Sequence, residues 1–319
     1  MTLNRRSFLK AVAASATLTQ VGAQSPPTEN PWNGPVLDLH FHMRRAPELN
    51  VAHLDGCGIS NANLLTRSNA VDQVREIQTR YPGRFIWFAS ADITKPEAEK
   101  QLTEAVKAGA GGLGELKFHV EADGPELRRM YALAAELDVP VLVHFQEVPH
   151  TPTEGVFSTG FQRFEAVLKR NPNTRFIGHA DAFWANISAG YANDVAYPTG
   201  PVKPGGLTGK LLGDYPNLYA DMSANSGNNA LSRDPGFTVE FLTQHRDKLI
   251  FGSDCGCADG NGGGASQVNN PGASRLAGKC VARETLTLLK RSAPPPLFRQ
   301  ITWENSRKLL RIAAQQPQF

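Results

Sequence analysis

Histidines and acidic residues recur at the ends of apolar segments in this chain. In the first such segment, Val36–Met43, His40 and His42 alternate with apolar residues. Residues two apart in a strand lie on the same face, so both imidazoles are expected to point to one side. Buried imidazoles need hydrogen-bond partners or a cation. The His-x-His spacing therefore indicates a metal site, with satisfied core histidines as the alternative.

Later apolar segments end in residues of the same kind. These are Glu115, Lys117 and His119 in one segment, His144 in the next, His179 and Asp181 in a third, and Asp254 in the last. Imidazole and carboxylate donors without cysteine suit zinc or a similar divalent first-row ion. Glu115 and Lys117 could instead form a buried ion pair. His119 and Asp181 could serve only as loop caps.

The segments that must position these residues alternate between strand-like and helix-like patterns. Eight apolar runs are expected as strands: Val36–His42, Ile59–Thr66, Phe85–Asp92, Gly112–His119, Val139–Gln146, Arg175–Asp181, Leu218–Ser223 and Leu249–Asp254. Helical spacing is clearest at Asn69–Tyr81, Pro96–Ala108, Pro125–Leu137, Phe161–Arg170 and the tail Pro296–Ala314. This alternation predicts a parallel (β/α)8 TIM barrel, whose chemistry lies at the carboxyl ends of the strands. An open doubly wound sheet is the alternative, although His-Met-Arg-Arg stands where its glycine-rich loop would be.

Two details of this pattern can be tested directly. In the first strand the alternation places Leu37, Leu39 and Phe41 together on the face opposite His40 and His42. Between the expected strands, the connections 182–217 and 255–277 are long. The second contains Asp-Gly-Asn-Gly-Gly-Gly, which cannot sustain a helix or strand. We interpret it as a lid over the barrel mouth, with a tolerated surface insertion as the alternative.

The amino terminus has the pattern of a targeting segment. Arg5 and Arg6 precede Ser-Phe-Leu-Lys, a mildly apolar run follows, and small residues surround Ala23. This resembles a bacterial twin-arginine signal, so residues 1–23 are expected to be removed and 24–319 to form one domain. The protein is then expected to be exported to the periplasm by the twin-arginine machinery. The run is too short and too polar for a stable membrane anchor.

Charge and cysteine content narrow the class of partner. Removal of residues 1–23 deletes three basic and no acidic residues, so 33 basic against 30 acidic residues becomes 30 against 30. A neutral chain gives no reason to expect nucleic acid or an anionic membrane as a partner. Four cysteines permit disulfides in an exported protein. Cys255 and Cys257 are too close to pair comfortably, so Cys57 or Cys280 would be involved, and free thiols are equally compatible with the sequence.

The combined motifs resemble those of the metal-dependent amidohydrolase superfamily. They are Asp-Leu-His-Phe-His in the first strand, single histidines ending the fifth and sixth, and Phe-Gly-Ser-Asp in the eighth. The chain is most similar to the amidohydrolase-related branch that includes carboxymuconate-semialdehyde decarboxylases and metal-dependent lactonases. The segments from Leu54 and from Ile301 also resemble this branch. The resemblance spans Val36 to Ile312 and specifies fold and metal better than substrate.

The resemblance implies roles for individual residues. His40, His42, His144 and Asp254 would bind the metal, and Asp254 would also take a proton from the attacking water. His179 would be a catalytic residue or a ligand of a second ion. Some superfamily members place a carbamylated lysine or a glutamate on the fourth strand to bridge two metals. Since this chain offers both Glu115 and Lys117, one ion and two ions remain open.

The sequence thus predicts a zinc-dependent hydrolase of a small amide, ester or lactone. Arg44 follows the His-x-His strand directly and could clamp a substrate carboxylate, with a solvated loop arginine as the alternative. A metal-dependent non-oxidative decarboxylase is the second interpretation, and a non-catalytic ligand- or metal-binding barrel is the third. The sequence is compatible with a homo-oligomer and specifies neither the substrate nor the oligomeric state.

Overall fold

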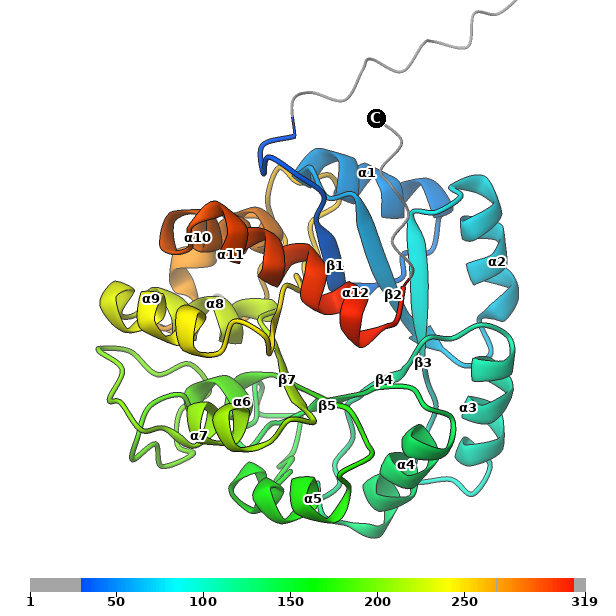
Figure 1. Cartoon of the computed structure of the whole chain (residues 1–319), viewed down its shortest axis with the longest axis horizontal. Coiled ribbons are helices and arrows are strands. Elements are labelled where there is room, and N and C mark those ends of the chain that lie inside the picture. The colour runs from blue at the N-terminus through cyan, green and yellow to red at the C-terminus, as the bar shows by residue number, and fades with distance from the viewer. Residues whose placement is uncertain (1–29, 268, 313–319) are drawn as a thin grey trace, which may run out of the picture. The chain divides into compact units, whose positions relative to one another are not determined.

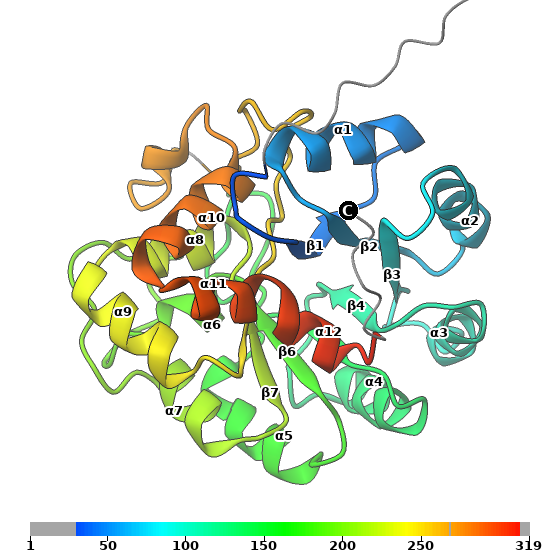
Figure 2. The same ribbon diagram turned by 45° about the horizontal axis from the view of Figure 1, so that its top comes forward.

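Eight parallel strands alternate with helices to form a nearly closed barrel in the computed structural model (Figures 1 and 2). The structure describes residues 30–267 and 269–312, and those from Pro31 onward form one compact unit. Neighbouring strands pair in sequence order from β1 to β8. The ends of the sheet approach each other where Leu39 N donates to Phe251 O at 3.1 Å. The predicted (β/α)8 barrel is therefore confirmed, and the signal segment 1–23 lies outside the described residues.

The elements follow the predicted order, with shorter strands. The strands are β1 (Leu37–His42), β2 (Asn61–Arg67), β3 (Phe85–Ser90), β4 (Leu113–Leu116), β5 (Val141–His144), β6 (Phe176–His179), β7 (Leu218–Asp221) and β8 (Leu249–Ile250). The helices are α1 (Pro47–Cys57), α2 (Val71–Arg80), α3 (Ala98–Lys107), α4 (Pro125–Glu136), α5 (Phe164–Arg170), α6 (Asp181–Ala185), α7 (Leu207–Asp214), α8 (Ala224–Ser232), α9 (Pro235–Gln244), α10 (Val281–Ser292), α11 (Pro295–Arg299) and α12 (Asn305–Leu309). Three single-turn elements complete them: η1 (Phe161–Arg163), η2 (Ser274–Leu276) and η3 (Gln300–Glu304).

An irregularity in β1 changes which way its side chains point. Between Asp38 and Phe41 the strand advances three residues while its partner β2 advances two, so β1 carries one extra residue. Leu37 and Leu39 pack in the apolar cluster at the centre of the barrel, whereas Phe41 packs in the outer cluster beneath the helices. The prediction that these three residues share one face was therefore wrong, because the bulge interrupts the period of two.

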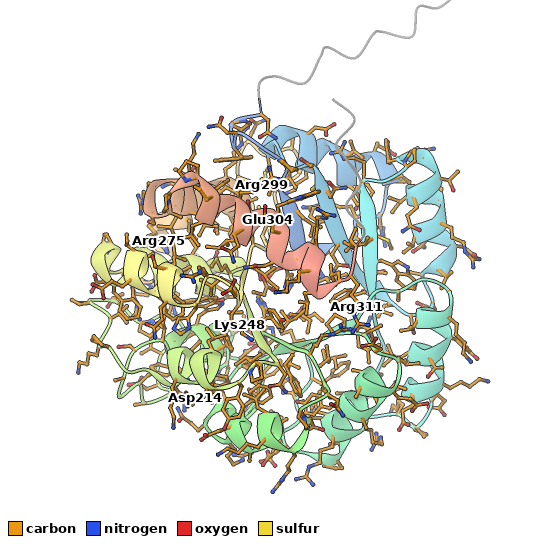
Figure 3. The ribbon with its side chains drawn as sticks, in the orientation of Figure 1. Asp214, Lys248, Arg275, Arg299, Glu304 and Arg311 are labelled. Carbon is orange, nitrogen blue, oxygen red and sulfur yellow. The ribbon has the colours of Figure 1, made fainter. Side chains whose placement is uncertain are left out.

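The amino-terminal end of the barrel is filled by side chains. Residues from six strands form the central cluster, and Leu309 of α12 packs against them. Leu309 is 2 % exposed, so the last helix closes this end. Figure 3 shows Arg299 and Glu304 beside each other on α11 and η3, where an ion pair of 2.8 Å joins them. In barrels of this type the active site lies at the opposite, carboxyl end of the strands.

The two long connections differ in structure. Residues 182–217 contain most of α6 and the whole of α7, which sequence reasoning did not predict, whereas 255–277 contains only η2 among its described residues. The start of this second connection is held by Arg44, whose guanidinium donates to the carbonyl oxygens of Cys255, Gly256 and Cys257 at 2.7, 3.2 and 2.9 Å. No helix in the described part of the chain has the length and apolar character needed to cross a membrane.

Candidate metal centre

Six of the predicted polar residues come together at the carboxyl ends of the strands. Apart from Asp254 they are held on strands: His40 and His42 on β1, Glu115 on β4, His144 at the end of β5 and His179 at the end of β6, while Asp254 follows β8. The extra residue in β1 turns His40 into the cluster, and His40 is fully buried. Different strands thus deliver imidazoles and carboxylates to one region, as a barrel of this type predicts.

His40, His42 and Asp254 form the first donor set. Their potential ligand atoms lie within 4.8 Å of one another. The Oδ1 atom of Asp254 is 3.3 Å from Nε2 of His42 and 3.9 Å from Nε2 of His40. Asp254 and His42 are partly exposed, with 30 % and 54 % of their side chains accessible. This set therefore combines a buried imidazole with two groups that a small molecule can reach.

Glu115, His144 and His179 form the second donor set, again within 4.8 Å of one another. Glu115 Oε1 lies 2.6 Å from His144 Nδ1 and 3.6 Å from His179 Nε2. Its other oxygen, Oε2, faces the first set, at 3.5 Å from His42 Nε2 and 3.8 Å from His40 Nε2. Glu115 therefore stands between the two sets, with one oxygen directed to each.

Asp221 at the end of β7 fixes the orientation of two of these histidines. Its Oδ2 atom accepts from His40 Nδ1 at 2.7 Å and from the Ser223 hydroxyl at 2.8 Å. Because this hydroxyl donates to Asp221, its oxygen accepts from His179 Nδ1, which is 2.8 Å away. In their neutral forms both imidazoles then carry their proton on Nδ1 and keep a lone pair on Nε2, as metal-binding histidines usually do.

Sequence reasoning missed Asp221 and Ser223. The expected strand 218–223 ends in Ala-Asp-Met-Ser after an apolar run, so the same signal that identified Asp254 was present. Asp221 and Ser223 are both fully buried.

The charges of the cluster suit a cation. Burial opposes protonation of His40, but the Asp221 and Asp254 carboxylates outweigh it and raise the pKa of His40 to about 10. Burial and the neighbouring His40 lower the pKa of His179 to about 3. Burial acts to raise the pKa of Glu115, but His144 and His40 hold it well below its usual value. The carboxylates around the His40 imidazole thus create a position that favours positive charge.

One buried atom tests directly whether a metal fits. Nε2 of His40 is buried and has no hydrogen-bond partner, although burying an unpaired polar atom is costly. Its Nδ1 is already committed to Asp221, so in the neutral imidazole, the form that binds a metal, the unpaired atom carries the lone pair that a divalent ion would accept. Imidazole and carboxylate donors match the preferences of divalent first-row ions. The residues present therefore fit a metal.

Two predicted site residues lie outside both donor sets. The Lys117 ammonium is 3.7 Å from Glu154 Oε1 and lies over the Phe157 ring, so of Glu115 and Lys117 only Glu115 reaches the cluster. The guanidinium of Arg44, expected to clamp a substrate carboxylate, instead donates to three main-chain carbonyls. Two other histidine and acid candidates are also engaged elsewhere: His119 Nδ1 lies 3.0 Å from Val156 O, and Asp181 Oδ1 lies 3.0 Å from His150 Nε2.

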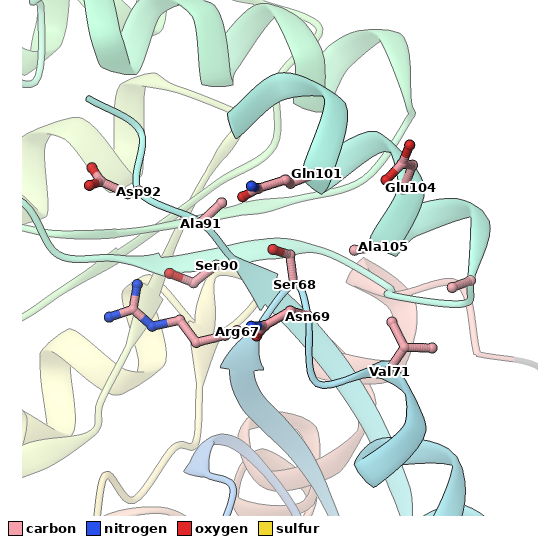
Figure 4. Close-up of a pocket in the computed structure, with 11 residues that line it drawn as sticks. Arg67, Ser68, Asn69, Val71, Ser90, Ala91, Asp92, Gln101, Glu104 and Ala105 are labelled. Atoms are coloured by element: carbon pink, nitrogen blue, oxygen red, sulfur yellow. The ribbon is translucent and has the colours of Figure 1, made fainter. Parts of the chain in front are cut away.

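A cavity of about 620 Å³ opens beside the carboxyl ends of β2 and β3 (Figure 4). Arg67, Ser90 and Asp92 line it from the strand ends, and Gln101 and Glu104 line it from α3. None of the residues of the two donor sets contributes to its lining. The cavity is therefore separate from the two donor sets.

Comparison with known proteins identifies the family. The amidohydrolase family model matches residues 58–312, which is most of the chain. The chain belongs to the amidohydrolase family. The match includes Glu115, His144, His179 and Asp254, whereas His40 and His42 precede it. The resemblance inferred from the motifs is thereby confirmed at the level of the superfamily, whose members are enzymes.

Solved structures of this fold carry several activities. A 5-carboxyvanillate decarboxylase from Novosphingobium aromaticivorans, complexed with manganese, is 12 % identical with a TM-score of 0.56, covering 89 % of this chain and 98 % of that one. A probable 2-pyrone-4,6-dicarboxylic acid hydrolase from Acinetobacter baumannii is 12 % identical, with a TM-score of 0.54 and coverages of 87 % and 99 %. A dihydroorotase from Campylobacter jejuni is 16 % identical, with a TM-score of 0.54 and coverages of 88 % and 85 %. No curated protein matches this amidohydrolase significantly.

Proposed function

We propose that this amidohydrolase is a metal-dependent hydrolase that opens an ester, lactone or amide bond in a small molecule and uses two divalent ions. The observation that carries the proposal is the position of Glu115, whose two oxygens face separate donor sets. Sites that hold two ions on a shared carboxylate are typical of hydrolytic enzymes. Zinc suits these donors best.

The residues divide naturally between two ions. His40, His42 and Asp254 would hold the first, His144 and His179 the second, and Glu115 would contact both. Asp221 supports each set, because it fixes the tautomers of His40 and His179. When bound, the ions supply Lewis acidity, which polarises a substrate oxygen and brings the pKa of a water molecule to about 7.

Asp254 is the residue best placed to move a proton. Its side chain is 30 % accessible, whereas Glu115 is 9 % accessible and His179 only 1 %. Burial acts to raise the pKa of Asp254, but His40 and His42 lower it to about 2, so its carboxylate is ionised and able to accept a proton at Oδ1 or Oδ2. His179 is neutral and held by Ser223, so its Nε2 serves as a ligand in this two-ion scheme.

The test measures metal per chain and turnover on the same preparations. Glu115→Gln and His179→Asn should each remove about half of the metal or more and lower turnover by about 10²- to 10⁴-fold. His119→Asn is the matched control, because its imidazole lies outside both donor sets. A His179→Asn protein with full metal and impaired turnover would contradict the two-ion scheme and return His179 to an acid/base role.

The same preparations separate hydrolysis from its rivals. Lactones, esters and amides should be opened with uptake of one water and no carbon dioxide. Release of carbon dioxide from aromatic carboxylates, without hydrolysis, would overturn the proposal in favour of a metal-dependent decarboxylase. Metal binding without turnover of any of these lactones, esters, amides or aromatic carboxylates would favour a binding barrel. Export by the twin-arginine route, which places the enzyme in the periplasm, belongs to the proposal and is tested separately below.

A further inference from the structure

All four cysteines of the chain gather with one histidine at a second location. His53 and Cys57 lie four residues apart on α1, Cys255 and Cys257 follow β8, and Cys280 caps the amino end of α10. The four thiols are free, and all five side chains are at most 6 % exposed. Figures 1 and 2 both show the segment after β8 passing beside α1. Three separate parts of the chain thus bring soft donor atoms to one buried place.

The spacing of these donor atoms resembles that of ligands around one ion. Cys280 Sγ is 3.5 Å from Cys57 Sγ and 3.7 Å from Cys255 Sγ. Nε2 of His53 is 3.7 Å from Cys57 Sγ, and donor atoms of His53, Cys255 and Cys257 lie within 4.8 Å of one another. Zinc binds sulfur at about 2.3 Å, so neighbouring sulfurs on a tetrahedral ion lie about 3.8 Å apart.

The hydrogen bonds around the cluster leave its donor atoms ready to bind. His53 Nδ1 is 2.7 Å from the carbonyl oxygen of Cys257, which can only accept, so this nitrogen carries the proton and Nε2 carries the lone pair. A metal-binding histidine typically donates its second nitrogen in this way. Sγ of Cys257 accepts from the amides of Gly260 and Gly262 at 3.1 and 3.3 Å.

We propose that this cluster is a thiolate-rich structural site for zinc, separate from the catalytic centre. His53 and Cys255 are ligands, and two of Cys57, Cys257 and Cys280 complete a four-coordinate shell. Each thiol that binds gives up its proton to solvent, and no oxidation is involved. The ion would link α1, the segment after Asp254 and the start of α10. The proposal does not depend on which reaction the catalytic centre performs.

A disulfide is the competing explanation, and the geometry favours it less. Cys280 lies at similar distances from two thiols but can pair with only one of them. Either disulfide would leave two thiols and the Nε2 lone pair of His53 without a covalent or metal partner. An ion engages donors from all three segments at once.

Cobalt substitution distinguishes the two sites, because the donor sets of the catalytic centre contain no cysteine. Full-length protein loaded with Co²⁺ should show thiolate-to-cobalt charge-transfer absorption in the near ultraviolet, and zinc-loaded protein should hold one equivalent in sulfur coordination by X-ray absorption spectroscopy. His53→Ala should lose that equivalent on dialysis against a mild chelator. His245→Ala, which removes a buried imidazole that packs against the Phe241 ring, should keep it.

A second variant guards against misfolding of the first. Cys57→Ser combined with Cys280→Ser leaves three donors for four positions, so the absorption should weaken while the fold, followed by circular dichroism, is kept. Absence of charge-transfer absorption in the cobalt-loaded parent would overturn the proposal. So would a thiol count of two in the unreduced metal-free protein that rises to four on reduction, since that result would show a disulfide.

Discussion

Asp221→Asn is the most informative single change in the candidate metal centre. The two oxygens of Asp221 accept three hydrogen bonds, from His40 Nδ1, the Ser223 hydroxyl and the Ser223 amide, at 2.7, 2.8 and 3.0 Å. An asparagine has one accepting oxygen and one donating nitrogen, so it cannot satisfy all three donors. If its nitrogen faces His40, the imidazole proton moves to Nε2, and the lone pair needed by a metal is lost.

The size of this effect follows from the support that Asp221 gives. Loss of a carboxylate that orients a metal-binding histidine weakens metal affinity by about 10- to 100-fold, or about 1.4–2.7 kcal/mol. Because metal binds only the native state, the metal-saturated variant should lose that much free energy of unfolding. For a domain of this size the melting temperature should fall by about 2–4 °C.

Competition with a chromophoric chelator measures the metal dissociation constant, and calorimetry with and without chelator measures the melting temperatures. Asp72→Asn is the matched control, because its side chain is 98 % exposed. A folded Asp221→Asn protein that binds metal within about twofold of the parent would refute the role assigned to Asp221. An equal fall in melting temperature with and without metal would indicate a packing defect.

Three further predictions test the candidate site, the fold and the cellular location. Gly252→Ala should remove most of the metal, because the added Cβ would lie 2.3 Å from Asp221 Oδ1 and 2.8 Å from His40 Cβ. Gly34→Ala is the control, because a Cβ added there meets nothing within 4 Å. Equal metal content in the two proteins would contradict this prediction. Leu309→Ala should lower the free energy of unfolding by about 2–5 kcal/mol in chemical denaturation, since it opens the closed end of the barrel, and a loss below 1 kcal/mol would show that α12 is dispensable there. Replacing Arg5 and Arg6 by lysine should leave the precursor in the cytoplasm in cell fractionation, and unchanged export would remove the twin-arginine proposal.

Sequence periodicity was sufficient for the barrel because its strands are buried on both faces. Runs such as Val139–Gln146 are almost wholly apolar and stand between helical patterns, which is typical of parallel strands. Periodicity did not locate the ends of the strands. Of the run Val139–Gln146, only Val141–His144 forms a strand. Periodicity also failed in β1, since a bulge depends on pairing with β2 and leaves no mark in the alternation.

The sequence likewise predicted some features of the candidate site and missed others. His40, His42, His144, His179 and Asp254 were identifiable because each interrupts an apolar segment. The sequence could not say that Glu115 rather than Lys117 faces the cluster, because both are on the same face of an ideal strand and only the observed end of β4 at Leu116 separates them. Nor could the sequence show that main-chain carbonyls 211 to 213 positions away would accept hydrogen bonds from Arg44.

Closure of the barrel has a consequence for the way this chain folds. The amide of Ser253 donates to Asp38 Oδ1 at 2.8 Å across 215 positions of sequence, and Leu309 completes the cluster that contains Leu37. A chain still emerging from the ribosome cannot make these contacts until almost all of it has been synthesised. Until then the edge of β1 is unpaired on one side and open to association with other strands. Contacts of such long range also slow folding, so the candidate metal centre should be among the last parts of the molecule to form.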